Sequence, residues 1–391
     1  MPRTIPQQVK KSNKPFPETV DLSTEEASAL GGKNSNLAAA KTLKNDEFYT
    51  LWADVEKEIN AYLEFDPELF RDKVVLLPCD DPEWSNFTKY FALHFAEFGI
   101  KRLISTSYAP DSKNDSNSHQ PTLFEAENPQ FDPVKTRANG KVFILEAVDL
   151  NGDGIVDLDD LQWKYLEGDG DFRSAEVTSL RDAADIVVTN PPFSLFREFM
   201  AWLVDGGKKF AVIGNQNAVI TKELFPLFKS NRLWLGASSP KEFRDGGHSD
   251  SAPLKSFGNI RWFTNIEHGR RHQPLQLMTA ADNIKHSKHK KVRGVGYSTY
   301  ENYNAIEVPF VDAIPSDHLG IMGVPISFLD RYDPGQFEIV WQASGNTRAS
   351  APASVLKTLG YTKMQVDRGG CGVVAGARVF SRILIQRKTT A

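Results

Sequence analysis

Residues 73–106 read KVVLLPCDDPEWSNFTKYFALHFAEFGIKRLIST. Residues 74–77 are a short apolar run typical of a buried strand, and the run ends at an acidic turn, Pro78-Cys79-Asp80-Asp81-Pro82. The next segment places Phe87, Phe91 and Phe98 on roughly one helical face, with Gly99 as a predicted cap, and residues 100–106 predict a second strand. This strand, turn, helix and strand form a βαβ unit. It predicts an α/β fold with a parallel sheet and a ligand at the carboxyl ends of its strands.

The composition is that of a globular protein. The chain has 391 residues, of which 40% are hydrophobic and 25% are charged, which suggests two or three folded units and excludes a collagen, a coiled-coil rod or a wholly disordered chain. It contains no apolar stretch of roughly 18 residues and no secretory leader, so we expect a soluble, intracellular protein without a membrane partner. The two cysteines are too few for a disulfide framework or a four-thiolate zinc site.

The pattern of apolar residues changes twice along the chain. Residues 1–33 have no apolar periodicity and predict a flexible N-terminal arm. Alternating strand and helix patterns make about residues 34–235 one α/β domain, interrupted by a polar insertion at 107–141. Residues 236–391 are rich in Gly, Ser, His and Pro, contain short strands such as 260–263, and predict a second, mixed α+β region.

The most informative motif is Asn190-Pro191-Pro192-Phe193, which follows a predicted strand at 185–189 and precedes a predicted helix at 194–204 with Ser194 as its N-cap. An exocyclic amine of a nucleobase is a poor nucleophile, and the Asn190 amide oxygen and the Pro191 carbonyl oxygen can accept its two hydrogens. The two prolines fix φ and make these acceptors rigid, while Phe193 can stack on a base flipped out of a duplex. The alternative is a rigid turn that only ends a strand.

Two further features fit an amino-methyltransferase that acts on DNA. The carboxylates of Asp80 and Asp81 would suit a methyl donor that carries a sulfonium and an ammonium, although such a turn is equally typical of a helix N-cap. A late basic stretch could bind DNA phosphates, or it could be a solvated loop. The predicted phosphate contacts are Lys255, Arg261, Lys285, Lys288, Lys290, Lys291 and Arg293.

Taken together, these residues resemble the EcoRI-type adenine-specific DNA methyltransferases, which use S-adenosylmethionine. The resemblance covers about residues 34–388. It rests on residues 44–50, 78–82 with 85–87, 170–172, 185–199, 214–217, 323–330 and 378–388.

The resemblance implies a Rossmann-like methyltransferase domain packed against a target-recognition, DNA-binding region. It also implies cofactor contacts from Tyr49 and Thr50 at the donor's amino-acid end, from Pro78, Asp80 and Asp81, and from Asp171 and Phe172 on the adenine side. It would place the enzyme in the cytoplasm, at the nucleoid of a bacterium or as a phage-encoded methylase. It leaves open whether a cognate restriction endonuclease accompanies it.

One loop departs from a plain methyltransferase pattern. Residues 149–160 put Asp149, Asn151 and Asp153 at positions 1, 3 and 5 of an EF-hand-like loop, with Gly at 6 and Asp160 at 12. A helix is expected to follow at 161–166. A structural Ca²⁺ site and a metal-free loop of Asx turns both remain open.

The predicted function is therefore site-specific methylation of adenine N6 in duplex DNA. Three alternatives remain: methylation of cytosine N4, which has similar geometry; methylation of glutamine side chains in proteins, which also uses an Asn-Pro-Pro-aromatic turn; and a Ca²⁺-dependent binding module. Asn at the first position of the motif favours adenine over cytosine.

Overall fold

The computed structural model describes residues 48–82, 85–109, 130–245 and 253–388. The predicted N-terminal arm, residues 1–33, and most of the polar insertion lie outside the described residues. Within the described part of the chain, no helix is long and apolar enough to cross a membrane.

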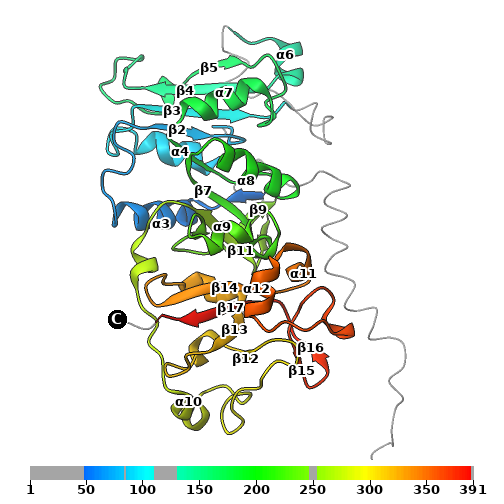
Figure 1. Ribbon diagram of the computed structural model, residues 1–391. Helices are drawn as coiled ribbons and strands as arrows, with labels where there is room; N and C mark the ends of the chain where they lie inside the picture. The colour runs from blue at the N-terminus through cyan, green and yellow to red at the C-terminus, as the bar shows by residue number, and fades with distance from the viewer. Residues whose placement is uncertain (1–47, 83–84, 110–129, 246–252, 389–391) are drawn as a thin grey trace, which may run out of the picture. The chain divides into compact units, whose positions relative to one another are not determined.

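The main sheet has eight strands, and its centre is parallel (Figure 1). In spatial order the strands are β5 (Gln162–Tyr165), β4 (Lys141–Glu146), β3 (Arg102–Ser107), β2 (Val74–Leu77), β6 (Ile186–Thr189), β7 (Lys209–Asn215), β11 (Ile260–Thr264) and β8 (Trp234–Leu235). Strand β2 is parallel to both β3 and β6, and β6 is parallel to β7. The outer strands β4, β5, β11 and β8 pair antiparallel with their neighbours. The predicted parallel βαβ unit is thus confirmed.

Helices cover both faces of this sheet. Alternate strand residues belong to two separate cores: Leu76 and Val187 face one core, and Val75 and Val188 face the other. Side chains of α7 (Ala175–Ala183) and α8 (Phe196–Asp205) complete the first core, while α3 (Trp52–Leu63) and α4 (Asn86–Leu93) complete the second. Because both faces are buried, the central strands read as continuous apolar runs.

Two expectations need correction. The helix predicted at residues 161–166 is a strand, β5, which pairs antiparallel with β4 and buries Trp163. The strand expected at 260–263 exists, but it lies in the main sheet beside β7, so this sheet includes residues well beyond 235. In both cases the deciding hydrogen bonds come from a neighbouring strand, which a local pattern cannot show.

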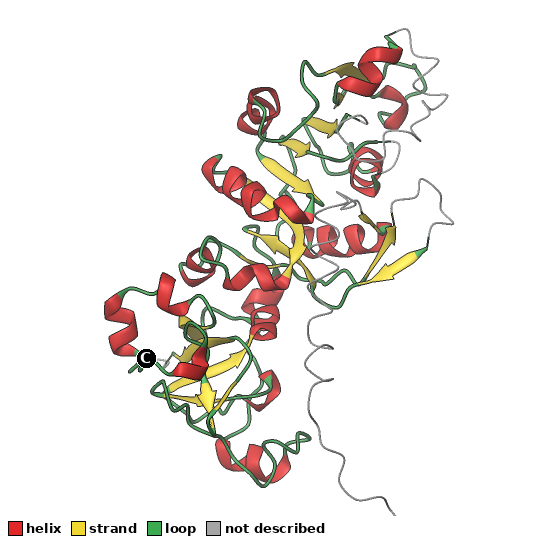
Figure 2. Ribbon diagram, turned by 90° about the vertical axis from the view of Figure 1, so that its right-hand side faces the viewer, coloured by secondary structure: helices red, strands yellow, loops and turns green. Residues whose placement is uncertain are grey.

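The remaining strands form smaller sheets (Figure 2). A four-stranded sheet has the order β12 (Ala305–Glu307), β13 (Ile321–Pro325), β17 (Arg382–Arg387) and β14 (Phe337–Ala343). A three-stranded sheet joins β1 (Phe48–Thr50), β9 (Glu242–Asp245) and β10 (Leu254–Ser256), and β15 (Val373–Val374) pairs with β16 (Ala377–Arg378). The ring of Trp341 in β14 packs edge-on against Phe225 of α9 (Phe225–Lys229), and one hydrophobic core continues from the main sheet into the four-stranded sheet.

Candidate active site

The chain order around β2 creates a switch point in the main sheet. From β2 the chain continues to β3 on one side, and later places β6 and β7 on the other side. Helices that follow neighbouring strands in opposite directions leave a crevice at the carboxyl ends of those strands. The acidic turn, residues 78–82, follows β2 at this edge, and Asn190 follows β6 directly. The two predicted motifs therefore meet at one end of the sheet.

Asp80 connects these two strand ends. Its side chain is buried, and it accepts a hydrogen bond from the Ser85 hydroxyl at 2.6 Å and approaches the Thr189 hydroxyl at 2.5 Å. Ser85 is also the N-cap of α4, where its oxygen accepts the Phe87 backbone N–H at 3.1 Å. Burial raises the pKa of Asp80 to about 7, although the hydrogen bonds from Ser85 and Thr189 oppose this shift.

The hydrogen count around Thr189 also favours a protonated Asp80. The Thr189 hydroxyl lies 2.5 Å from the Pro78 carbonyl oxygen as well as 2.5 Å from the Asp80 carboxyl group. A hydroxyl has one hydrogen and can donate to only one of these two acceptors. A protonated Asp80 would donate to Thr189, which could then donate to Pro78. The neutral form would connect β2 to β6 through hydrogen bonds, while the Asp81 side chain of the same turn is partly exposed.

Thr50 and Tyr49 lie in β1, beside the start of α4. The Thr50 carbonyl oxygen accepts a hydrogen bond from Asn86 Nδ2 at 2.8 Å. The Thr50 hydroxyl is buried and has no hydrogen-bond partner among the described residues. A buried hydroxyl of this kind usually has a partner, so its position next to the acidic turn fits a polar ligand group. Tyr49 is half-buried in the same strand.

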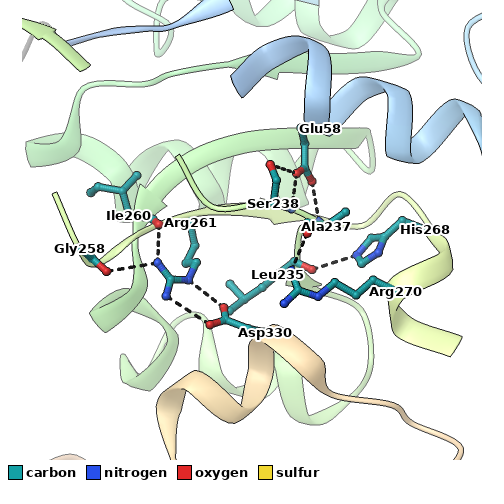
Figure 3. Close-up of polar contacts among 10 residues, drawn as sticks. All are labelled: Glu58, Leu235, Ala237, Ser238, Gly258, Ile260, Arg261, His268, Arg270 and Asp330. Carbon is teal, nitrogen blue, oxygen red and sulfur yellow. Dashed lines mark hydrogen bonds and ion pairs between the residues drawn. The ribbon is translucent and has the colours of Figure 1, made fainter. Parts of the chain in front are cut away.

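Glu58 holds the segment that leads to β9, the strand that pairs with β1, and no local sequence pattern indicates this role. Its fully buried carboxylate accepts a hydrogen bond from Tyr62. As Figure 3 shows, it also accepts hydrogen bonds from the Ala237 N–H at 2.8 Å and from both the N–H and the hydroxyl of Ser238 at 2.6 Å. Burial raises the pKa of Glu58, and the hydrogen bonds from Ser238 and Tyr62 oppose this rise. Residues 236–241 lead from β8 to β9. By binding this segment, the Glu58 carboxylate helps to position β9 for its pairing with β1.

Asp171 and Phe172 lie by the carboxyl end of β3. The Ala109 N–H donates to the Asp169 carbonyl oxygen at 2.8 Å, which joins this loop to the end of β3. The Asp171 carboxylate is bound by Arg173, whose guanidinium lowers the pKa of Asp171. Phe172 is buried and packs edge-on against Phe199 and Trp202. In this structure the Phe172 ring is thus part of the core.

The connection from the Asn190–Phe193 motif to α8 differs from the predicted one. Asn190 is half-buried at the end of β6, Pro191 is buried, and Phe193 begins the short 3-10 helix η4 (Phe193–Leu195). The prediction of Ser194 as the N-cap of the α-helix was wrong, because η4 precedes α8 and Leu195 occupies that cap. The helix is anchored by Phe196, whose ring lies on Gly214 of β7; a Cβ atom at residue 214 would come 2.3 Å from this ring.

The predicted phosphate-binding residues do not form one group. Arg261 is engaged internally: its guanidinium forms an ion pair with Asp330 at 2.8 Å and donates to the Ile260 carbonyl oxygen (Figure 3). Lys255 lies in the exposed strand β10. Lys285 is in α10 (Ala280–His286), and Lys288 is paired with Asp312 at 2.7 Å. The other predicted contacts in this stretch are exposed; they are Lys290, Lys291 and Arg293.

The loop at 149–160 is held by its own hydrogen bonds. Asp149 accepts the N–H groups of Gly152 at 2.6 Å and Gly154 at 2.8 Å, and Asp153 and Asn151 form similar turns. Asp160 accepts the Leu150 N–H at 2.7 Å, and this backbone hydrogen bond lowers the pKa of Asp160. Among the described residues, no three His, Cys, Asp or Glu side chains are grouped so that they could hold a metal ion. Calcium binding therefore stays a prediction.

Gln216 is a further polar group at this end of the sheet, and its role is not predicted by the sequence motifs. Gln216 begins the 3-10 helix η5 (Gln216–Ile220), directly after β7, the neighbour of β6. Its side-chain nitrogen is buried without a hydrogen-bond partner among the described residues. The motif at 214–217 contained this residue, but only the strand order shows that it lies next to the strand that ends at Asn190.

Comparison with known proteins identifies relatives of this chain. The family model described as "Adenine-specific methyltransferase EcoRI" matches residues 36–388. The chain is 37% identical over 326 residues to the type II methyltransferase M.EcoRI of Escherichia coli, covering 80% of this chain and 90% of that protein. It is 32% identical to M.MpnI of Mycoplasma pneumoniae over 364 residues, covering 89% of this chain and 97% of the relative. No solved structure gives a significant match.

Proposed function

Because the chain belongs to the EcoRI family of adenine-specific DNA methyltransferases, we propose that it methylates N6 of an adenine that is flipped out of a short specific duplex sequence. The observation that carries this proposal is the position of Asn190 and Pro191. They follow β6 at the switch point, next to the acidic turn of β2, to which Thr189 and Asp80 join them.

Each residue of the motif has a proposed role. The Asn190 amide oxygen and the Pro191 carbonyl oxygen accept the two hydrogens of the adenine amine, which directs its lone pair out of the ring system. The fixed φ angles of Pro191 and Pro192 keep these acceptors in place before the base arrives. Phe193 stacks on the flipped base.

The family implies S-adenosylmethionine as the methyl donor, and the residues at the edge of the sheet fit such a ligand. When bound, it supplies a methyl group on a positively charged sulfur. The partly exposed Asp81 would face its cationic groups, and the buried Thr50 hydroxyl would gain a partner in its amino-acid end. Asp80 would hold the acidic turn in its conformation through its hydrogen bonds to Ser85 and Thr189. The other proposed contacts are Tyr49, Pro78 and Asp171; Phe172 is a weaker candidate because its ring lies in the core.

We further propose that the main sheet is the Rossmann-like methyltransferase domain. The target-recognition region would then consist of the four-stranded sheet and the segments around it, between about residue 265 and the end of the chain. Phosphate contacts are proposed from Lys255 and from the basic stretch at 285–293. Arg261 is a weaker candidate because Asp330 already binds its guanidinium.

The reaction can be tested with a tritium-labelled donor. The protein is incubated with the labelled donor and unmethylated genomic DNA, and the DNA is then digested to nucleosides. We expect the label in N6-methyldeoxyadenosine alone. Label in N4-methyldeoxycytidine would replace the proposal by the cytosine alternative, and label in the protein fraction would support methylation of glutamine side chains.

A further inference from the structure

Near the end of the chain, residues 361–380 form a surface whose exposed charges are all positive. Gln365, Val366, Arg368 and Arg378 line a shallow groove of about 450 Å³ between β16 and the 3-10 helix η9 (Gln365–Asp367). We call this surface, with Lys363 and Phe380 at its margins, the hairpin groove. The segment has one carboxylate, Asp367, which is completely buried and accepts hydrogen bonds from Tyr361, Met364 and Gly369.

The two arginines of the hairpin groove are not used by the fold. Neither guanidinium forms an ion pair or a hydrogen bond with any residue that the structure describes. Some other arginines in the same half of the chain are paired, since Arg261 binds Asp330 and Arg382 binds Glu307. In a chain with a net charge of −4, two neighbouring cations without an acidic partner favour an anionic ligand.

An aromatic side chain stands beside these cations. Phe380 is 86% exposed, more than any other large hydrophobic residue in the described part of the chain. Val379 packs against the core, and its backbone N–H donates to the Gly372 carbonyl oxygen at 2.9 Å. Because successive side chains of an extended segment point to opposite sides, Arg378 and Phe380 point outward together.

The backbone of the hairpin groove adopts conformations that side chains other than glycine seldom take. Arg368 has a φ of 46° and Ala375, in the turn between β15 and β16, has a φ of 50°. Such positions are strained for residues other than glycine and cluster at active sites and ligand-binding sites. Arg368 adopts this conformation as the C-cap of η9, where it also lines the groove.

Hydrogen bonds connect this surface to the catalytic edge of the main sheet. Asn346 donates a side-chain hydrogen bond to the Ile220 carbonyl oxygen at 3.1 Å, and Ile220 ends η5, which directly follows β7. The Arg348 N–H in turn donates to the Gly369 carbonyl oxygen at 2.9 Å. The short helix α11 (Thr347–Ser350) thus bridges the two, and β15 and β16 lie below it in Figure 1. The basic stretch at 285–293 packs instead against residues 310–312, through the Lys288–Asp312 ion pair and the stacking of His289 on Phe310.

From these observations we propose that the hairpin groove binds the DNA duplex beside the flipped adenine, with Arg368 and Arg378 on phosphates and Phe380 against a base or sugar. This inference rests on the proposed function, since it presupposes a DNA substrate. The combination of unpaired guanidinium groups and an exposed ring is the one that nucleic acids favour, because the cations meet the backbone and the ring meets the flat face of a base.

The test compares the Arg368→Gln/Arg378→Gln double variant with a control of equal charge change. The control, Lys73→Gln/Lys101→Gln, removes two exposed lysines at the opposite edge of the sheet, where β2 and β3 begin. Binding to fluorescent duplex DNA is measured from 50 to 200 mM salt. We expect the groove variant to bind about tenfold or more weakly, with a salt slope smaller by about 2, and the control to match the wild type. Equal slopes and affinities for the groove variant and the wild type would overturn the inference.

Phe380→Ser separates the ring from the charges. This variant should weaken DNA binding and methyl transfer while leaving the salt slope unchanged. Unaltered DNA binding would show that Phe380 does not contact DNA. Donor binding, measured by calorimetry without DNA, should be the same in all variants and confirms that they are folded. A wild-type protein that neither binds nor methylates DNA would refute the proposed function itself, whereas active wild type with an unaffected groove variant refutes only this inference.

Discussion

The hydroxyl group of Thr189, the last residue of β6, lies 2.5 Å from the carboxyl group of Asp80 in the turn after β2. The same hydroxyl lies 2.5 Å from the Pro78 carbonyl oxygen, so one hydrogen faces two acceptors. Protonation of Asp80 resolves this conflict and agrees with a pKa raised by burial to about 7. The ends of the two strands that carry the proposed donor and base sites are thus joined through a carboxylic acid.

This arrangement predicts an unusual dependence of stability on pH. Between the ordinary pKa of 3.8 and about 7, the unfolded chain releases the Asp80 proton and the folded protein keeps it. The contribution of Asp80 to the free energy of unfolding therefore falls as pH rises through this range, by on the order of 4 kcal/mol at most, and is constant above it.

Asp80→Asn removes this titration and keeps the hydrogen bonds, because the Asn amide can donate to Thr189 and accept from Ser85. We expect the difference in unfolding free energy between variant and wild type to shift in favour of the variant from pH 4 to pH 7, measured by denaturant unfolding. A difference that stays constant across this range would show that Asp80 has an ordinary pKa.

The ion pair between Arg261 and Asp330 yields a second prediction. Both side chains are largely buried, 14% and 17% exposed, and the pair joins β11 to the 3-10 helix η8 (Ile326–Arg331). Arg261→Gln and Asp330→Asn should each lower the free energy of unfolding by about 2 kcal/mol, and the double variant should lose less than the sum. Were Arg261 a phosphate contact instead, its variant would weaken DNA binding strongly, and Asp330→Asn would not.

Gly214→Ala tests how the catalytic motif is positioned. The added methyl group would meet the Phe196 ring at 2.3 Å, and such overpacking costs about 1–3 kcal/mol. Because Phe196 begins α8 three residues after Phe193, we expect methyl transfer to fall more than stability alone explains. Gly258→Ala is the matched control, since a Cβ atom there meets nothing within 4 Å. If a destabilised Gly214→Ala protein transferred methyl groups at the wild-type rate, the packing of α8 would have no effect on catalysis.

The parts of the fold that could be predicted from sequence are those encoded locally. The strand at 74–77 was recognisable because burial on both faces requires an unbroken apolar run. The helix predicted at 161–166 was wrong because a short run around Trp163 suits a strand as well as a helix, and pairing with β4 decides between them. Roles that depend on distant partners were also out of reach: the hydroxyl that meets Asp80 is 109 residues away in the sequence, and the Arg261 partner is 69 away.

The loop at 149–160 permits a direct test for calcium. Titration calorimetry of the whole protein with millimolar CaCl₂ should give heat if Asp149, Asn151, Asp153 and Asp160 bind the ion, and Asp149→Ala/Asp160→Ala should abolish it. No heat above that of dilution would leave the loop as a set of Asx turns stabilised by its own hydrogen bonds.

The central claim concerns Asn190, and single-turnover methyl transfer by Asn190→Ala tests it most directly. The variant is saturated with the donor, mixed with unmethylated DNA, and its rate is compared with that of the wild type, while calorimetry measures donor binding separately. The account predicts a rate lower by about 100-fold or more with donor affinity largely unchanged. Transfer at the wild-type rate would contradict it.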